Sequence, residues 1–375
     1  MPFIVDTGIP FGNACDISVG IGGQITEVSF APDPRGSPEC MWFCMRIISR
    51  QQPAPSKLRL LFKNPQNILG GSRPLNIRPV MRYGSQSWQR LEAGELCERA
   101  DGRVDLAWTV DAPADHLDLA FCYPYGRDEL FTLLCHARGY FRCDSIGVSQ
   151  GGRPLLRLAN DYGQPASARP GLYLIARQHA GETPGSWVLD GFLRHLAALG
   201  EAGPMVWAVP LANIDAIENG DYGKDNYPYD LNRAWGRPPM RHETLVLQQD
   251  IERWKKRCRP VLAIDFHAPG ASEVDGVYAC VPDSQHYPEI YREACPWSAL
   301  CREALAEYAA PVFERMPNHP SRWESPYFTQ YLWEQHRLCG LALEIPYALA
   351  NGHILTRESY HEAGARLAAA VVKRL

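Results

Sequence analysis

The sequence lacks the features that mark several large classes of protein. No stretch approaches the roughly 18 to 20 uninterrupted apolar residues of a membrane span. The first residues contain neither a basic segment nor a long apolar one, so we expect no secretory signal. No basic cluster with interleaved aromatic residues is present, and 38 basic against 42 acidic residues give a net charge of -4. We therefore expect neither a membrane nor a nucleic acid as partner.

The twelve cysteines are scattered and include no C-x-x-C pair. In a chain of this length, that pattern is typical of reduced thiols in the cytosol and disfavours both a disulfide framework and a cysteine metal site. We therefore predict a cytoplasmic protein. Nothing in the sequence indicates its oligomeric state.

The first third of the 375 residues differs in pattern from the rest, and two domains are expected for this length. Residues 1–125 contain short alternating or apolar segments separated by Pro, Gly, Asn and Asp, at 41–48, 57–62, 104–110 and 116–122. This spacing predicts antiparallel strands in a β-sandwich. The turn signal at 123–126 marks the expected boundary.

Residues 126–375 alternate between apolar strands and amphipathic helices. Strands are expected at 172–176, 205–209, 261–266 and 341–345, and helices at 128–138, 186–199, 243–257, 296–308, 327–336 and 358–375. Continuous apolar strands between such helices predict an α/β domain with a mixed, largely parallel sheet.

Three potential metal ligands directly follow two of the expected strands. His179 and Glu182 lie in a short turn after the strand at 172–176, and His267 follows the strand at 261–266. Sites in open α/β sheets form at the carboxyl ends of strands, so these side chains can meet at one edge. Three protein ligands with a fourth position left to water are the arrangement of a catalytic zinc. Asp265 either orients an imidazole or pairs with a neighbouring helix.

Two further segments carry charged groups with a possible chemical role. Glu344 lies near the end of an apolar strand, either in a buried salt bridge or as a general base beside a water on zinc. Asn232 and Arg233, in the sequence DLNR, either form a helix start or clamp a carboxylate, because a guanidinium beside an amide can bind both oxygens.

The segments RQHAGETPGSW, DLNRAW, DFHAPG and LALEIPY resemble, in order and approximate spacing, those of carboxypeptidase A-like zinc metallopeptidases. The RxHxGE form resembles the cytosolic carboxypeptidase subfamily of bacterial type, and IPFGNACDISV, MWFCMRI and LDLAFCYPYG are similar to its front β-sandwich. The resemblance implies a catalytic domain over residues 126–375 behind a sandwich over 1–125.

The resemblance also implies roles for single residues. It implies one zinc ion held by His179, Glu182 and His267, with Glu344 as the general base. It implies that Asn232 and Arg233 hold the C-terminal carboxylate of a peptide or protein tail. The expected activity is therefore a metallocarboxypeptidase, a hydrolase that removes C-terminal residues, with acidic tails as the substrates associated with the subfamily.

One position departs from the resemblance. An arginine that stabilises the oxyanion usually lies ten residues before the last residue of DLNR, and this sequence has Gly223 there, followed by Lys224. Lys224 either replaces it as a point charge or is a solvated loop residue. A catalytic tyrosine is also expected, and Tyr327 and Tyr331 are the candidates, of which we name Tyr327.

Two alternative functions stay open at this point. Deacylases of the aspartoacylase and succinylglutamate desuccinylase group share similar motifs but cleave N-acyl amino acids. A non-catalytic zinc- or peptide-binding protein is the second alternative, supported by the missing arginine. A basic pocket is expected for acidic tails. The arginines available for it, each of which either enters the site or is a surface charge, are Arg292, Arg302, Arg315, Arg322 and Arg337.

Overall fold

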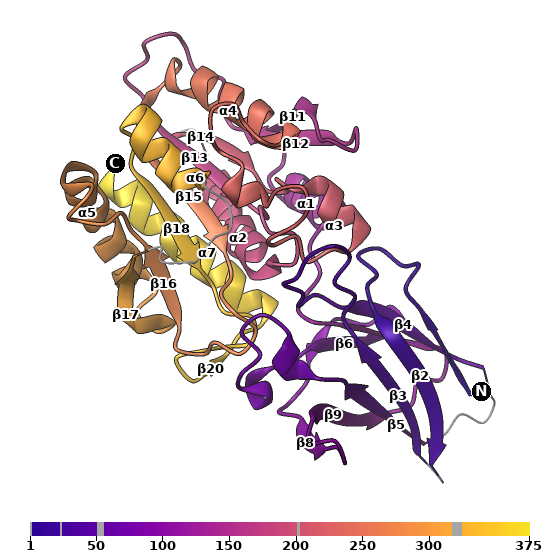
Figure 1. Ribbon diagram of the computed structural model, residues 1–375. Helices are drawn as coiled ribbons and strands as arrows, with labels where there is room; N and C mark the ends of the chain where they lie inside the picture. Colours follow the sequence, from indigo (N-terminus) through magenta and orange to yellow (C-terminus); the bar gives the residue numbers. More distant parts are fainter. Residues whose placement is uncertain (1, 23–24, 51–55, 201–202, 317–324) are drawn as a thin grey trace.

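The computed structural model describes residues 2–22, 25–50, 56–200, 203–316 and 325–375. The front of the chain forms two five-stranded sheets, drawn in indigo and purple in Figure 1. One sheet has the order β1 (Phe3–Asp6), β4 (Cys44–Ser49), β10 (His116–Ala120), β6 (Val80–Tyr83), β7 (Gln89–Arg90). The other has the order β2 (Cys15–Gly22), β3 (Ile25–Ala31), β5 (Lys57–Phe62), β9 (Val104–Asp111), β8 (Glu95–Glu98).

Alternating apolar residues bring the two sheets together. In β5 every second side chain is buried, and Phe62 packs edge to face against Phe43, directly before β4 of the other sheet, with ring centroids 5.3 Å apart. The predicted β-domain is confirmed, with one local difference: β3 and β5 run parallel. The chain leaves β3 for β4 in the other sheet and returns to β5 in the original direction. Since β10 ends at Ala120 and α1 begins at Arg127, the boundary after residue 125 stays a prediction that falls within this connection.

The rest of the chain is built on a mixed eight-stranded sheet. Its order is β11 (Arg142–Val148), β12 (Pro154–Ala159), β14 (Met205–Val209), β13 (Pro170–Ala176), β15 (Arg259–His267), β18 (Gly340–Glu344), β16 (Val277–Cys280), β17 (Ala309–Arg315). The central strands β14, β13, β15 and β18 are parallel, so their carboxyl ends lie at one edge. The α/β prediction is confirmed.

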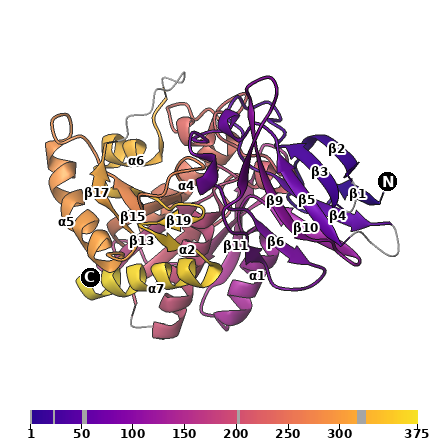
Figure 2. The same ribbon diagram turned by 90° about the horizontal axis from the view of Figure 1, so that it is seen from below.

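Helices cover both faces of this sheet, as Figure 2 shows. They are α1 (Arg127–His136), α2 (Thr183–Leu199), α3 (Ile214–Asn219), α4 (His242–Lys255), α5 (Pro288–Ala304), α6 (Phe328–Tyr331) and α7 (Arg357–Arg374). Neighbouring residues of β13 face opposite ways: Leu174 packs in the core that includes α2 and α7, and Ile175 in the core that includes α4 and α6. This burial on both sides is why the strand is continuously apolar.

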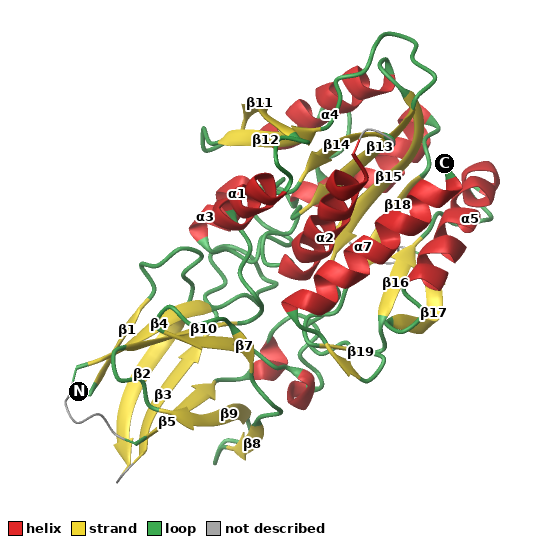
Figure 3. Cartoon of the chain, turned by 180° about the vertical axis from the view of Figure 1, so that it is seen from behind, coloured by secondary structure: helices red, strands yellow, loops and turns green. Residues whose placement is uncertain are grey.

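Two predicted helices have different bounds in the structure. The helix expected from Pro296 begins earlier, at Pro288, and contains Pro296 in its interior. The helix expected over 327–336 is divided into α6 and a π-helical turn, Leu332–His336. A small hairpin, β19 (Leu349–Ala350) and β20 (His353–Ile354), precedes α7. Figure 3 separates the strand-rich front domain from the helix-covered sheet.

Candidate metal centre and active site

The three predicted metal ligands converge at the carboxyl ends of β13 and β15. His179 lies in the turn after β13, Glu182 precedes the first turn of α2, and His267 is the last residue of β15. One donor atom from each residue lies within 4.8 Å of the others, and all three side chains are buried. Residues that are 85 apart in the sequence thus share one site because parallel strands end together.

The Glu182 carboxylate lies between the two imidazoles. Its Oε1 is 2.8 Å from His179 Nδ1, and its Oε2 is 2.7 Å from His267 Nδ1. The backbone N–H of Ala268 also donates to Oε2, at 3.2 Å. Burial opposes ionisation of Glu182, but the two histidines hold its pKa well below the ordinary value. The group is therefore a carboxylate that faces two nitrogen donors.

Two aspartates hold the other nitrogens of the imidazoles. His179 Nε2 is 3.2 Å from Asp230 Oδ1, and His267 Nε2 is 2.8 Å from Asp265 Oδ2. A carboxylate accepts a hydrogen bond, so it places the proton on Nε2 and leaves the Nδ1 lone pair for a cation. Asp265 thus contacts an imidazole, as the first of its two predicted alternatives requires, and its orienting role stays a prediction. Two nitrogens and a carboxylate with these partners fit a zinc ion.

The same charges act on the imidazoles themselves. Burial lowers the tendency of His179 to ionise, but Glu182 and Asp230 outweigh it and raise its pKa. For His267, burial is likewise outweighed by Asp265 and Glu182, and the pKa is raised well above the ordinary value. The buried carboxylates therefore favour positive charge at this point. Protons on the imidazoles can supply that charge, and so can a bound divalent cation.

Asp230 was not among the residues that the sequence analysis assigned to the site. Besides His179, its carboxylate accepts from the backbone N–H of Asp225 at 2.8 Å and of Asn232 at 2.7 Å. An aspartate that caps a short turn is common, and its contact with His179 spans 51 positions. The only indication in the sequence that Asp230 belongs to the site was its position as the first residue of DLNR.

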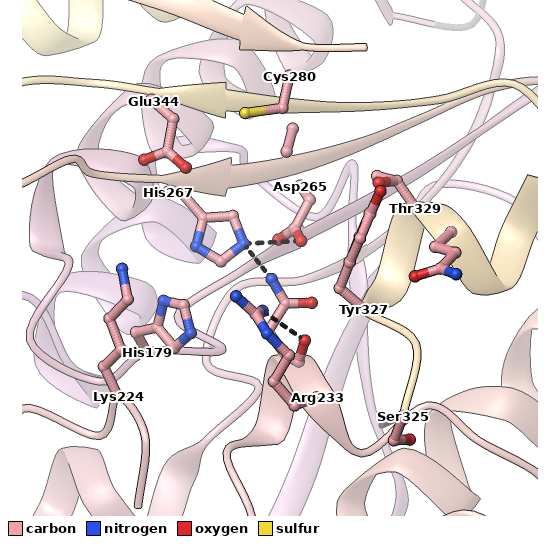
Figure 4. Close-up of a pocket in the computed structure, with 13 residues that line it drawn as sticks. His179, Lys224, Arg233, Asp265, His267, Cys280, Ser325, Tyr327, Thr329 and Glu344 are labelled. Carbon is pink, nitrogen blue, oxygen red and sulfur yellow. Dashed lines mark hydrogen bonds and ion pairs between the residues drawn. The ribbon is translucent and has the colours of Figure 1, made fainter. Parts of the chain in front are cut away.

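Glu344 and Lys224 lie beside the three donors. Glu344 ends β18 and is the direct strand neighbour of His267. Burial, together with the charge of Glu182, raises the pKa of Glu344. The Lys224 ammonium is 4.0 Å from Glu182 Oε1, and Figure 4 shows it directed toward the imidazoles from the side opposite Asp265. Lys224 is thus not a solvated loop residue.

Gly223 explains the departure noted in the sequence. Its φ is +81°, a conformation that favours glycine, and a Cβ at this position would lie 2.7 Å from the Ala180 nitrogen. An arginine at residue 223 therefore does not fit this backbone. The neighbouring Lys224 supplies the cation that faces the site.

Asn232 and Arg233 occupy a 3-10 turn, Leu231–Arg233. The Asn232 side chain accepts from the Phe328 N–H at 2.9 Å, and its Nδ2 is 3.0 Å from His267 Nε2. This amide therefore lies between the start of α6 and the His267 ring. The Arg233 guanidinium donates to its neighbour's carbonyl at 2.8 Å and lines the same pocket.

Comparisons with known proteins give one consistent result. No family model matches the sequence. Human cytosolic carboxypeptidase 6 is 29% identical over 341 residues, which cover 81% of this chain and 65% of that protein. Cytosolic carboxypeptidase 1 of Danio rerio is 25% identical over 207 residues, 48% of this chain and 18% of that protein. The chain thus spans less than two thirds of the length of either relative.

Solved structures show the same architecture. A metallo-carboxypeptidase from Burkholderia cenocepacia has a TM-score of 0.76 at 20% identity, covering 100% of this chain and 98% of its own. A metallo-carboxypeptidase from Pseudomonas aeruginosa has a TM-score of 0.74 at 19% identity, covering 99% and 98%. These likenesses show the fold, and the curated relatives add similarity in sequence.

The chain is similar to cytosolic carboxypeptidases in sequence and to metallo-carboxypeptidases in fold.

In this carboxypeptidase homologue, the two candidate tyrosines lie in different places. Tyr327 precedes α6 and lines the pocket, where burial raises its pKa. Tyr331 is buried in the core beside Trp235, and its hydroxyl is 2.9 Å from His336 Nε2. Of the two, Tyr327 alone lines the pocket.

The pocket of the carboxypeptidase homologue has a volume of about 200 Å³ and opens beside the metal centre. Figure 4 shows its lining. Beyond the donors it consists of Lys224, Asn232, Arg233, Asp265, Cys280, Ser325, Tyr327, Thr329, Gln330, Ala342 and Glu344.

The arginines expected to determine specificity do not line this pocket where the structure describes them. Arg315 pairs with Glu273 at 3.6 Å and lies over the Tyr278 ring. Arg292, Arg302 and Arg337 are exposed, and Arg322 lies outside the described residues. Among the described residues, the cations of the pocket are Lys224 and Arg233, with the histidines.

The described helices include none with the length and apolarity needed to cross a bilayer.

Proposed function

We propose that the chain is a zinc-dependent carboxypeptidase that hydrolyses the last peptide bond of a peptide or protein tail. The observation that carries the proposal is the grouping of a His-Glu-His donor set, the acid Glu344 and the guanidinium of Arg233 around one pocket. Zinc bound by His179, Glu182 and His267 would supply a water of lowered pKa and polarise the carbonyl.

Each remaining side chain has a separate task in the proposed reaction. Glu344 accepts a proton from water as the water oxygen bonds to the scissile carbonyl carbon. That proton passes to the amide nitrogen as the C–N bond breaks, which yields a new carboxylate and a free amino acid. Lys224 stabilises the negative charge on the carbonyl oxygen.

Substrate binding is assigned to the far side of the pocket from Lys224. Arg233 pairs with the terminal carboxylate, because a guanidinium can donate to both oxygens. Asn232 is the second group proposed to hold this carboxylate, and Tyr327 closes over the bound residue. The requirement for a free carboxylate is what distinguishes a carboxypeptidase from other peptidases.

Peptides with free and amidated C-termini, assayed beside N-acyl amino acids, test this function. We expect release of the last residue from free-carboxylate peptides and none from the amides. Cleavage of N-acyl amino acids alone would establish the deacylase alternative. Zinc binding without hydrolysis of either class would establish a binding protein.

The pocket also predicts which C-terminal residues are released. Apart from the two histidines, Lys224, Arg233 and Glu344, the described lining consists of neutral side chains and the Asp265 carboxylate. An acidic side chain here would be desolvated without a cation of its own, because Lys224 and Arg233, the basic side chains of the described lining besides the histidines, have other tasks in the proposed reaction. We therefore expect neutral residues to be released at least about tenfold faster than glutamate, in kcat/KM. This differs from the acidic preference expected from the resemblance.

A series of peptides that differ only in the last residue measures this preference. The amidated form of each peptide serves as its control. A preference for glutamate over alanine and glutamine would contradict the proposal that neutral residues of the pocket lining contact the released side chain.

Replacing Asp265 with asparagine should weaken zinc binding by about 10- to 100-fold, the usual effect of losing a partner of a ligand histidine. Asparagine keeps the shape and an acceptor for Gln178, which donates to Asp265 at 2.6 Å. Chelator competition measures the affinity. Asp275→Asn, in a loop outside the pocket, is the matched control. Equal affinities in the two variants would show that Asp265 does not support the ligand.

We further propose that the protein works in the cytoplasm. All twelve cysteines carry free thiols, which supports a reducing compartment. Non-reducing and reducing gels of protein from intact cells test this location, with disulfide-linked species as the contrary result.

A further inference from the structure

The loop that carries Lys224 lies against the front domain. This segment, residues 219–225, starts at the last residue of α3 and is here called the Lys224 loop. The Asn13 amide of the front domain donates to the Gly220 carbonyl at 2.9 Å, a contact between residues 207 positions apart. Asn13 is fully buried, and its own Oδ1 accepts from the Asp33 N–H at 2.7 Å. The amide is therefore held in one orientation.

Two more front-domain residues contact the same loop. The Arg35 guanidinium donates to the Asn219 carbonyl and lies 3.8 Å from the Asp221 carboxylate. The Ser37 hydroxyl lies within hydrogen-bond distance of the backbone carbonyl of Lys224 itself and of the Glu39 carbonyl, at 2.9 Å from the latter, so that these two carbonyls share its proton. Ser37 is 4% exposed, so water does not readily replace this hydrogen bond.

On its other side, the Lys224 loop is attached to the metal centre. The Tyr222 carbonyl accepts from the Gly181 N–H at 2.8 Å, in the turn between His179 and Glu182. The N–H of Asp225 donates to Asp230, the partner of His179. The peptide group that follows Lys224 is thus held on both sides. Ser37 contacts its carbonyl, and Asp230 accepts from its N–H.

Fixing the backbone on both sides affects the position of the ammonium, because lysine is a flexible cation. Its ammonium lies at the end of four methylene groups, without the planar fork of arginine, and Gly223 before it has no side chain to pack. The position of the ammonium, 4.0 Å from Glu182, therefore depends on how firmly the backbone of residue 224 is fixed. On the side away from the metal centre, the residues that fix this backbone belong to the front domain.

We infer that Ser37 and Asn13 are positioning residues for Lys224, so that the front domain completes the active site. The inference rests on the proposed function for the role of Lys224. Neither residue touches the substrate pocket. Both act through the backbone of the Lys224 loop, and their loss should affect the transition state rather than substrate binding.

A double-mutant cycle tests this inference on a peptide that the unmodified chain cleaves. We expect Ser37→Ala to lower kcat by about three- to tenfold, as loss of one hydrogen bond would, with KM nearly unchanged. In a Lys224→Ala background, Ser37→Ala should have no further effect. Asn76→Ala is the matched control, because Asn76 donates across the same domain interface to the Ser272 carbonyl at 3.0 Å, away from the Lys224 loop.

Independent effects of Ser37 and Lys224, or an equal loss of kcat in Asn76→Ala, would overturn the inference. Asn13→Ala extends the test if thermal melts show that it folds. A crystal structure of Ser37→Ala supplies a readout without turnover, since the Lys224 ammonium should leave its place beside Glu182. An unmoved ammonium would refute positioning, whereas absence of any peptide hydrolysis by the unmodified chain would refute the proposed function instead.

Discussion

Replacing Glu344 with glutamine is expected to lower kcat by about 10²- to 10⁴-fold while zinc stays bound. Glutamine has nearly the same shape but cannot accept the proton from water. Glu344 is not one of the three converging donors, so its loss leaves the His-Glu-His set intact. Its position beside His267 in the sheet places it next to any cation held there.

The measurement is kcat with metal content determined on the same samples. Glu273→Gln is the matched control, because this glutamate lies in the loop after β15 and pairs with Arg315 outside the pocket. Full metal with lost turnover supports the role of base. Undiminished hydrolysis in Glu344→Gln would remove Glu344 from the mechanism.

Replacing Glu182 with glutamine should abolish both zinc binding and activity. The carboxylate faces both imidazole Nδ1 atoms, at 2.8 and 2.7 Å, and an amide presents one oxygen where two are needed. Because Glu182 is 1% exposed, its loss also leaves buried groups without a partner, which costs about 3–5 kcal/mol of folding stability.

Thermal melts with and without zinc distinguish the proposed roles of Glu344 and Glu182. Zinc should raise the melting temperature of the unmodified chain and of Glu344→Gln, because a ligand that binds the folded state stabilises it. It should have no effect on Glu182→Gln. A zinc-dependent shift of normal size in Glu182→Gln would show that another group binds the metal.

The convergence of His179, Glu182 and His267 could be predicted because the strands that carry them are strongly apolar. A continuous apolar run marks a buried parallel strand, and parallel strands end at a common edge. The predicted grouping is confirmed by the structure, while the roles of its members stay predictions. The contact between Asp265 and an imidazole could be predicted in the same way, because Asp265 is two residues from His267 on the same strand.

Other parts of the site depend on contacts that the sequence does not encode locally. Asp230 meets His179 across a separation of 51 residues, and Asn13 meets Gly220 across 207. The sequence showed that an arginine was missing at Gly223, but only the backbone conformation explains why glycine is needed there. The parallel pairing of β3 and β5 was likewise hidden, because alternation reveals the buried face of a strand and not its direction.

Zinc titration of the metal-stripped chain, with release of the C-terminal residue followed at each step, tests the central claim most directly. Within the described residues, one set of three donors surrounds one point, so activity should rise in proportion to zinc and level off at one ion per chain. A chelator should abolish it again. Hydrolysis that persists without metal, or one bound zinc without release of any C-terminal residue, would contradict the account.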